Sequence, residues 1–230
     1  MYAAVIADII ASRSIEQRYA AQEALKATLL VANERYAYAL ASPFTLTLGD
    51  EFQGLLHRAS NLFEILDFIR FRHAEFGFRF GIGLGEILTA IDPRSSLGAD
   101  GPAYWNARRA LEHVHARHGY RFTNMRIEAG DAPSGDGCAN DTLRLCGFVE
   151  GRWRSSQRAF VRDYILRNGH SRDVVQKTLA KELGMSPQLL NQNIRLSGLH
   201  LYLDAKRRLG ENLQKALEEA ARGKAKEPHP

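Results

Sequence analysis

Two adjacent carboxylates, Asp50 and Glu51, stand between two short apolar runs and are the first candidates for chemistry in this chain. The runs at residues 44–48 and 54–56 predict a β-hairpin whose turn carries both acids. Two negative charges at one hairpin tip repel each other unless a positive charge lies between them. A divalent cation is the usual partner, because hard cations take oxygen ligands and often keep phosphate oxygens in their coordination shell.

A third carboxylate, Asp8, ends an apolar run at residues 2–7 that predicts a strand. Two strand ends that each present a carboxylate can hold one or two metal ions over a nucleoside triphosphate. Asp8, Asp50 and Glu51 are therefore candidate ligands of Mg²⁺ or Mn²⁺. The alternative is an ordinary acidic hairpin turn without a ligand, together with an aspartate that caps a helix.

The residues after Asp8 are candidates for phosphate binding, because backbone amides that open a helix can cradle phosphate oxygens. These amides belong to Ile9, Ile10, Ala11 and Ser12. Arg13 suits phosphate because its guanidinium bonds two oxygens at once. The alternatives are that Ser12 caps the helix and that Arg13 forms a surface ion pair.

The elements that must position these residues alternate as β-α-β-β-α-β-α-β. We expect strands or hairpins at about 2–8, 44–57, 78–87 and 122–128, and helices at about 15–38, 59–72 and 103–117. The core of this order is the ferredoxin-like split βαβ arrangement, an antiparallel sheet covered by helices on one face. Such a fold makes Asp8 and Asp50 neighbours.

One predicted strand has an unusually bare face. Between residues 78 and 85, Phe78, Phe80, Ile82 and Leu84 alternate with Arg79, Gly81, Gly83 and Gly85. Three glycines on one face suit the close approach of a ligand or of another backbone. The alternatives are β-bulges or tight helix packing.

Three segments of the chain together resemble the SatD family. They are residues 7–13 (Ala-Asp-Ile-Ile-Ala-Ser-Arg), residues 48–53 (Leu-Gly-Asp-Glu-Phe-Gln), and residues 100–103 (Asp-Gly-Pro-Ala) followed by Ala107-Arg108. The same order is similar to class III nucleotide cyclases, and residues 49–52 resemble the end of the diguanylate-cyclase signature. The resemblance implies a Mg²⁺-dependent site for a purine nucleoside triphosphate, with GTP expected. It also implies phosphate-charge stabilisation by Arg108 and Arg109, and a homodimer by analogy with class III cyclases.

The chain also departs from those cyclases at positions that matter for catalysis. Leu46 stands where they place a base-selecting lysine, and Trp105 stands where they place an asparagine, with Asn106 one position away. Leu48 replaces the first glycine of the diguanylate-cyclase hairpin. We therefore expect nucleotide binding with slow or absent cyclase turnover.

The second half of the chain has the spacing of a DNA-binding helix-turn-helix at residues 176–195. Gly184 suits the end of a first helix, while Ser186 and Pro187 suit the start of a second. The side chains expected to face outward and to read base edges or grip phosphates are Gln188, Asn191, Gln192 and Arg195. The same geometry also occurs in structural and protein-binding domains.

Charge is unevenly distributed along the chain, whose formal net charge is +5. Residues 1–151 carry 15 Lys and Arg against 18 Asp and Glu, whereas residues 152–230 carry 16 against 8. The basic half favours nucleic acid, with Arg172 and Lys177 as phosphate contacts. The alternative is a solvated basic face, or a docking surface for the acidic first half.

The 230 residues, 45% of them hydrophobic and 25% charged, are typical of a globular protein. The expected class is α+β. A cyclase-type palm at 1–130 precedes a connecting segment at 131–151, an all-α helix-turn-helix domain at 152–220 and a frayed tail at 221–230. No apolar run has membrane-spanning length, and the two cysteines make no pair, so a soluble cytoplasmic protein is expected. Three functions follow: a nucleotide-responsive DNA-binding regulator, a cyclase or nucleotidyltransferase with a basic nucleic-acid- or partner-binding domain, or a degenerate palm for protein interaction.

Overall fold

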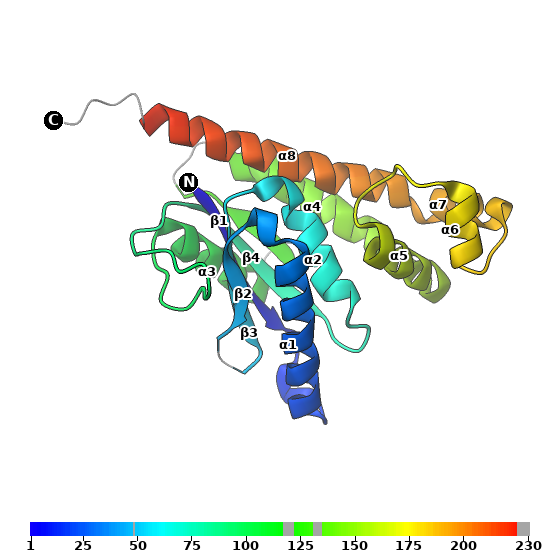
Figure 1. Ribbon diagram of the computed structural model, residues 1–230, viewed down its shortest axis with the longest axis horizontal. Helices are drawn as coiled ribbons and strands as arrows, with labels where there is room; N and C mark the ends of the chain where they lie inside the picture. The colour runs from blue at the N-terminus through cyan, green and yellow to red at the C-terminus, as the bar shows by residue number, and fades with distance from the viewer. Residues whose placement is uncertain (48, 117–121, 131–134, 225–230) are drawn as a thin grey trace.

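The computed structural model describes residues 1–47, 49–116, 122–130 and 135–224 (Figure 1). Leu48, residue 117 at the end of an expected helix, residues 131–134 of the expected connecting segment and residues 225–230 of the expected tail lie outside the described residues.

Five strands form one sheet in the order β2-β3-β1-β4-β5. They are β1 (Tyr2–Ile9), β2 (Leu40–Leu46), β3 (Glu51–Leu56), β4 (Phe78–Gly85) and β5 (Met125–Glu128). The first four strands have the order of a split βαβ unit, and their neighbouring pairs are antiparallel. β5 runs parallel to β4, so the antiparallel arrangement expected for the core holds for these four strands, but the sheet as a whole is mixed. The cause is the helical crossover between β4 and β5, which returns the chain in the same direction.

Eight α-helices lie within the described residues. They are α1 (Arg18–Arg35), α2 (Leu62–Phe71), α3 (Pro102–His115), α4 (Gly135–Gly151), α5 (Ser155–Asn168), α6 (Gln176–Glu182), α7 (Pro187–Ser197) and α8 (Leu199–Lys224). The overall class is therefore α+β, as expected. Helix α4 lies within the expected connecting segment at 131–151.

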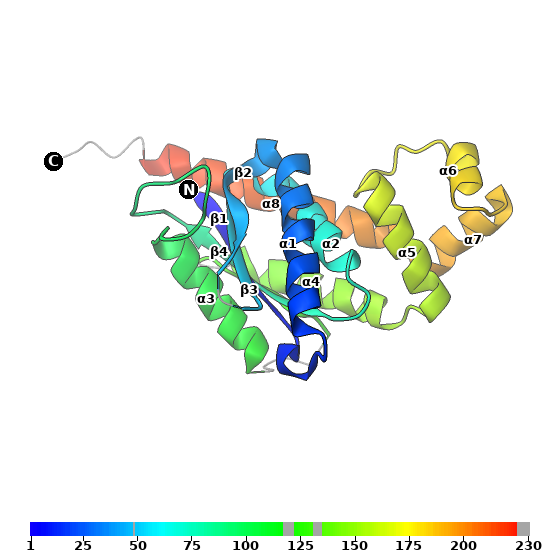
Figure 2. The ribbon, with the colours of Figure 1, turned by 60° about the horizontal axis from the view of Figure 1, so that its bottom comes forward.

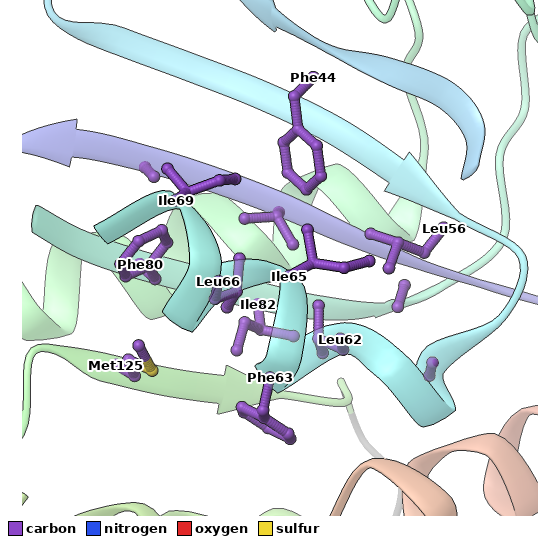
Figure 3. Close-up of a cluster of buried hydrophobic side chains, with 14 of the residues drawn as sticks. Phe44, Leu56, Leu62, Phe63, Ile65, Leu66, Ile69, Phe80, Ile82 and Met125 are labelled. Carbon is purple, nitrogen blue, oxygen red and sulfur yellow. The ribbon is translucent and has the colours of Figure 1, made fainter. Parts of the chain in front are cut away.

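The main core lies between the sheet and the helices α1, α2 and α8. Side chains from one face of α2, including Ile65, Leu66 and Ile69, lie over Phe80 and Ile82 of β4 (Figure 3). All five of these side chains are fully buried. Burial of that kind stabilises a fold by about 1.5–3 kcal/mol for each large apolar side chain.

Helix α3 covers the opposite face of the sheet (Figure 2), so the expectation that helices cover one face only is wrong. The glycines of β4 explain this second layer. A Cβ atom on Gly83 would lie 2.0 Å from the carbonyl oxygen of Ala103, and one on Gly81 would lie 2.1 Å from that of Ala107. The bare strand face is therefore filled by the backbone of α3, which is the helix-packing alternative.

A second core cluster joins α5, α6 and α7 to the start of α8. Leu199, Tyr202 and Leu203 of α8 belong to this cluster, whereas Leu209 and Leu213 pack in the main core. In Figure 1, α8 runs along the whole molecule, from α7 to the end of the sheet where β1 begins. One long helix thus joins the two halves of the chain in a single packed structure.

A buried ionic network reinforces that junction. Asp67 on α2 is fully buried and accepts hydrogen bonds from Lys206 Nζ at 2.7 Å and Arg70 Nε at 2.8 Å. Its other oxygen lies 2.9 Å from His170 Nε2, and Tyr202 donates to both oxygens at 3.2–3.3 Å. Burial alone raises the pKa of this carboxyl, but Lys206 and Arg70 outweigh burial and hold the pKa well below its ordinary value.

None of the helices in the described part of the chain combines the length and apolar composition needed to cross a membrane.

Candidate functional site

Asp8 and Glu51 meet on the α3 side of the sheet. Ala4 and Ile6 of β1 pack against α3, and Asp8 faces the same way because strand side chains alternate with a period of two. In the pairing of β1 with β3, Asp8 lies directly opposite Glu51. Two of the three predicted metal ligands are therefore adjacent on neighbouring strands.

Three cationic or ionisable side chains surround these two carboxylates. Arg79 Nε lies 2.9 Å from Asp8 Oδ1, and His115 Nε2 lies 2.6 Å from Asp8 Oδ2. Arg108 binds Glu51 with both terminal nitrogens, at 2.6 and 2.8 Å. We call Asp8, Glu51, Arg79, Arg108 and His115 the carboxylate cluster. The positive charge that two neighbouring carboxylates require is supplied here by the protein itself.

The carboxylate cluster is open to solvent on the side of Arg108 and His115. The Asp8 and Glu51 side chains are only 12% and 23% exposed, whereas Arg108 and His115 are 44% and 46% exposed. Hydrogen bonding to Glu51 is the main reason that the pKa of Arg108 is raised. An anion approaching from solvent therefore meets Arg108 and His115 before it meets the carboxylates.

The third predicted ligand, Asp50, faces another partner. Its Oδ1 lies 3.9 Å from Nη2 of Arg18, at the start of α1 on the other side of the sheet. Its backbone carbonyl accepts a hydrogen bond from the amide of Ile9 at 3.3 Å. Asp50 is thus a neighbour of the end of β1, as expected, but its carboxylate does not join the carboxylate cluster.

Two of the four amides predicted to cradle phosphate already have partners. The Ile9 amide donates to Asp50, and the Ile10 amide donates to the carbonyl of Gly77 at 2.9 Å. Ala11 adopts a left-handed conformation with φ of 54°. The phosphate-binding prediction therefore depends on the amides of Ala11 and Ser12.

Ser12 begins a three-residue 3-10 helix, Ser12–Ser14, rather than the long helix that was expected there. The long helix α1 begins only at Arg18, so Ser12 does not cap it. Arg13 is exposed to solvent, so its position is compatible both with the predicted phosphate contact and with the alternative of a surface ion pair.

The two neighbouring arginines of α3, Arg108 and Arg109, have different partners. Arg108 donates to Glu51 within the carboxylate cluster, whereas Arg109 donates to the side-chain oxygen of Asn106. Asn106 is buried and donates in turn to the carbonyl of Leu84 at 2.7 Å. Trp105 is exposed and donates to Asp100 at 2.7 Å. Asn106 therefore holds α3 against β4 and does not reach the carboxylate cluster.

Sequence reasoning did not select Arg79 and His115, although both left a signal. Arg79 shares the face of β4 that carries Gly81, and that face was already marked as unusual. His115 follows Arg108 by two helical turns and therefore lies on the same face of α3. Arg79 could have been selected because it pairs with Asp8 in the register of β1 with β4, and His115 because it lies on the same face of α3 as Arg108.

Helices α6 and α7 have the local geometry that their sequence predicts. Gly184 between them has φ of 66°, and Ser186 accepts a hydrogen bond from the amide of Leu189 at 3.2 Å to cap α7. Leu190 and Ile194 are buried. The outward row is exposed and consists of Gln188, Asn191, Gln192 and Arg195.

The basic character of this half is partly balanced within the protein. Arg172, a predicted phosphate contact, pairs with Asp204 of α8. Arg158 pairs with Glu150 at 3.1 Å, and Lys206 is buried against Asp67. Lys177 is exposed. The cations that face solvent are therefore fewer than the sequence count implies.

The donor chemistry of the carboxylate cluster fits a hard cation with a phosphate ligand, since Asp8 and Glu51 offer oxygen atoms from adjacent strands. Among the residues that the structure describes, no group of three or more His, Cys, Asp and Glu side chains is arranged to hold a metal ion. Two protein carboxylates are nevertheless a common number for Mg²⁺, which usually keeps waters and takes substrate phosphates as its other ligands.

Comparison with known proteins gives a family for the chain. None of the curated proteins compared with it matches. The model of the SatD family matches residues 2–213, which covers the sheet, α3 and the helices through most of α8. The chain belongs to the SatD family.

Proposed function

We propose that the carboxylate cluster binds Mg²⁺, or Mn²⁺, together with a purine nucleoside triphosphate. The observation that carries this proposal is the register of Asp8 opposite Glu51, with Arg79 and Arg108 bonded to them. Triphosphate sites need oxygen ligands for the metal and arginines for the phosphates within reach of each other. Both kinds of group are present at one end of this sheet.

Binding would exchange the ionic partners of these side chains. In the free protein, Arg79 neutralises Asp8 and Arg108 neutralises Glu51. With the metal–triphosphate complex, the carboxylates would turn to Mg²⁺ and the guanidinium groups would turn to phosphate oxygens. Arginine suits this exchange because its fork binds carboxylate and phosphate in the same bidentate manner.

GTP is the expected nucleotide because of the family resemblance, and slow turnover is the expected chemistry. Catalysis needs donors directed at charge that develops only in the transition state. Asn106 is held by Leu84, and Leu46 cannot hydrogen-bond a purine edge. We therefore favour a nucleotide-binding regulator over the alternative of a cyclase or nucleotidyltransferase.

The effector part of this proposal is DNA binding through α7. Gln188, Asn191, Gln192 and Arg195 form an exposed polar row, and the residues from 152 onward carry 16 Lys and Arg against 8 Asp and Glu. Polar side chains on such a helix can read base edges, and nearby cations supply affinity for phosphates. A nucleotide-responsive regulator of DNA, acting as a homodimer, is the function that combines both sites.

The deciding experiment measures GTP and ATP binding by calorimetry in Mg²⁺ and in EDTA, with product analysis by mass spectrometry on the same samples. We expect Mg²⁺-dependent binding of GTP that weakens at least about tenfold in Asp8→Asn and in Glu51→Gln, because each loses a charge-assisted metal contact. Weaker Mg²⁺-dependent GTP binding in Asp50→Ala would show that the Asp50 carboxylate turns from Arg18 to the metal.

The matched control is Glu211→Gln, which removes an exposed carboxylate bonded to Arg207 at 2.7 Å on α8, far from the sheet end. Its affinity for GTP should equal that of the wild type. Unchanged GTP affinity in both Asp8→Asn and Glu51→Gln would refute the metal–triphosphate assignment. Robust turnover that disappears in Glu51→Gln would favour the enzyme alternative.

DNA binding is tested on the full-length chain with random and selected duplexes over a range of salt concentrations. Arg195→Ala or Gln192→Ala should change sequence preference, whereas Lys177→Ala should weaken all duplexes equally and reduce the salt slope by about one. Lys215→Ala, on an exposed position of α8, is the control. No binding at low salt would make α6 and α7 a protein-docking unit instead.

A further inference from the structure

A cavity of about 750 Å³ lies where the sheet layer meets the C-terminal helices. The segment between α2 and β4 forms one wall with His73 and Phe76, and α5 forms another with Arg162. The described lining residues include none of the carboxylate cluster. The volume is within the range of about 300–1,000 Å³ that small-molecule sites occupy.

Flat aromatic surfaces line much of this cavity. Phe71 and Trp153 come from two different parts of the chain, with ring centroids 6.5 Å apart and planes 32° apart, and the Arg70 guanidinium lies over the Phe71 ring, 4.2 Å from its centroid. Phe76 stacks on His73 at 4.7 Å with an interplanar angle of 22°. Such surfaces favour a planar ring, because offset stacking of aromatic faces adds to the stabilisation from burial.

His73 contributes a polar atom that has no partner within the described structure. Its side chain is only 4% exposed, and its Nε2 is buried without a hydrogen bond to any described residue. Its Nδ1 lies 3.3 Å from Glu75 Oε1, so the proton belongs on Nδ1 and Nε2 is an acceptor. Burial lowers the pKa of this ring, which disfavours its protonated form. A buried acceptor of this kind costs stability unless a ligand donates to it.

Most of the cations among the described lining residues are already bonded to carboxylates of the protein, and Arg70 and Lys206 are bonded to buried Asp67. The cations are Arg70, Arg158, Arg162 and Lys206, against the carboxylates Glu75 and Glu150. Glu150 is already neutralised by Arg70 and Arg158, with oxygen–nitrogen distances of 2.8 and 3.1 Å. Arg162 uses its Nε for Asp163 at 3.2 Å, and its terminal nitrogens can serve an anion.

From these observations we infer that the cavity binds a planar heteroaromatic anion with a ring N–H group, the chemistry of a purine mononucleotide. The ring would lie among Phe71, Phe76 and Trp153 and donate to His73 Nε2, and the anionic group would meet Arg162. No metal is required, which separates this site from the one proposed for a triphosphate.

A ligand here would act on the junction between the two halves of the chain. Arg70, Glu150 and Lys206 line the cavity and also belong to, or contact, the network around buried Asp67. Occupancy would therefore favour one arrangement of α2 against α4 and α8, because it adds contacts to both sides at once.

The test uses the full-length protein in EDTA, with GMP and AMP as probes and with guanosine and adenosine as uncharged counterparts. We expect calorimetry to detect one metal-independent site for GMP or AMP, with binding about tenfold weaker for the nucleoside. His73→Phe keeps the stacking face and removes the acceptor, and Arg162→Ala removes the cation. Each should weaken mononucleotide binding about tenfold, since one such contact accounts for about 1.4 kcal/mol.

Arg167→Ala on the same helix is the matched control, because Arg167 is exposed and outside the cavity lining. Ala159→Trp fills the cavity from α5 and tests the assignment independently if His73→Phe does not fold. Asp8→Asn should bind the mononucleotide like the wild type, so failure of the triphosphate site leaves this result intact. No binding at millimolar GMP or AMP, or unchanged affinity in both Arg162→Ala and Ala159→Trp, would overturn the inference.

Discussion

Replacement of Asp67 by alanine should destabilise the protein more than any exposed charge substitution. Asp67 is fully buried on α2 and is bonded to Lys206 at 2.7 Å, Arg70 at 2.8 Å and His170 at 2.9 Å. The variant leaves Lys206, itself only 3% exposed, without its carboxylate. Arg70 keeps Glu150 as a partner, so most of the cost falls on the lysine.

The size of the effect follows from that geometry. Removal of one partner of a buried ion pair costs about 3–5 kcal/mol, because the remaining charge stays buried and unpaired. For a chain of this length, 1 kcal/mol corresponds to about 2–4 °C in Tm. Asp67→Ala should therefore lower the Tm by about 6–20 °C, by combining those two ranges.

Urea unfolding followed by circular dichroism, with a thermal melt in parallel, measures this change. Glu211→Gln removes an exposed ion pair on α8 and should cost less than about 1 kcal/mol. Adding Lys206→Met to Asp67→Ala should recover part of the loss, since the unpaired charge is then gone. A loss below about 1 kcal/mol in Asp67→Ala, or no recovery in the double variant, would show that the network is not what joins α2 to α8.

Three further results are expected. Gly83→Ala should lower the free energy of unfolding by about 3 kcal/mol in a urea titration, because its Cβ would lie 2.0 Å from the Ala103 carbonyl oxygen. Gly137→Ala on α4 is the control: its Cβ would meet open space, so it should be neutral or stabilising in the same titration. Burial lowers the pKa of His73, so the unfolded ring binds a proton at a higher pH than the folded ring, and stability should fall as pH drops below about 6.5. Urea midpoints between pH 7.5 and 5.5 should therefore slope less in His73→Phe than in the wild type. Burial also raises the pKa of the Cys146 thiol, so a thiol reagent at neutral pH should label exposed Cys138 and leave Cys146 unreacted until denaturant is added.

The order of strands and helices in the first half was readable from the sequence, because local pattern alone determines it. Alternating apolar residues in β4 and the three- and four-residue spacing in α2 predict those elements at nearly their observed bounds. Gly184 and Ser186 likewise mark the turn before α7 by local backbone requirements. Family membership also follows from residues that are close together in the chain, around Asp8 and around Asp50.

Only the tertiary structure determines which side chains from distant elements come into contact. The sequence marks Asp8 as a candidate ligand, but only the register of β1 with β3 and β4 sets Glu51 and Arg79 on either side of it. The glycines of β4 do not say whether a ligand or a helix approaches, and the packing of α3 answers that question. From its basic sequence neighbours, Lys206 is expected on a basic surface, yet the fold buries it against Asp67, which lies 139 residues earlier in the chain. Contacts of this kind depend on long-range packing, which has no local pattern, so the sequence names candidate residues and the fold selects their partners.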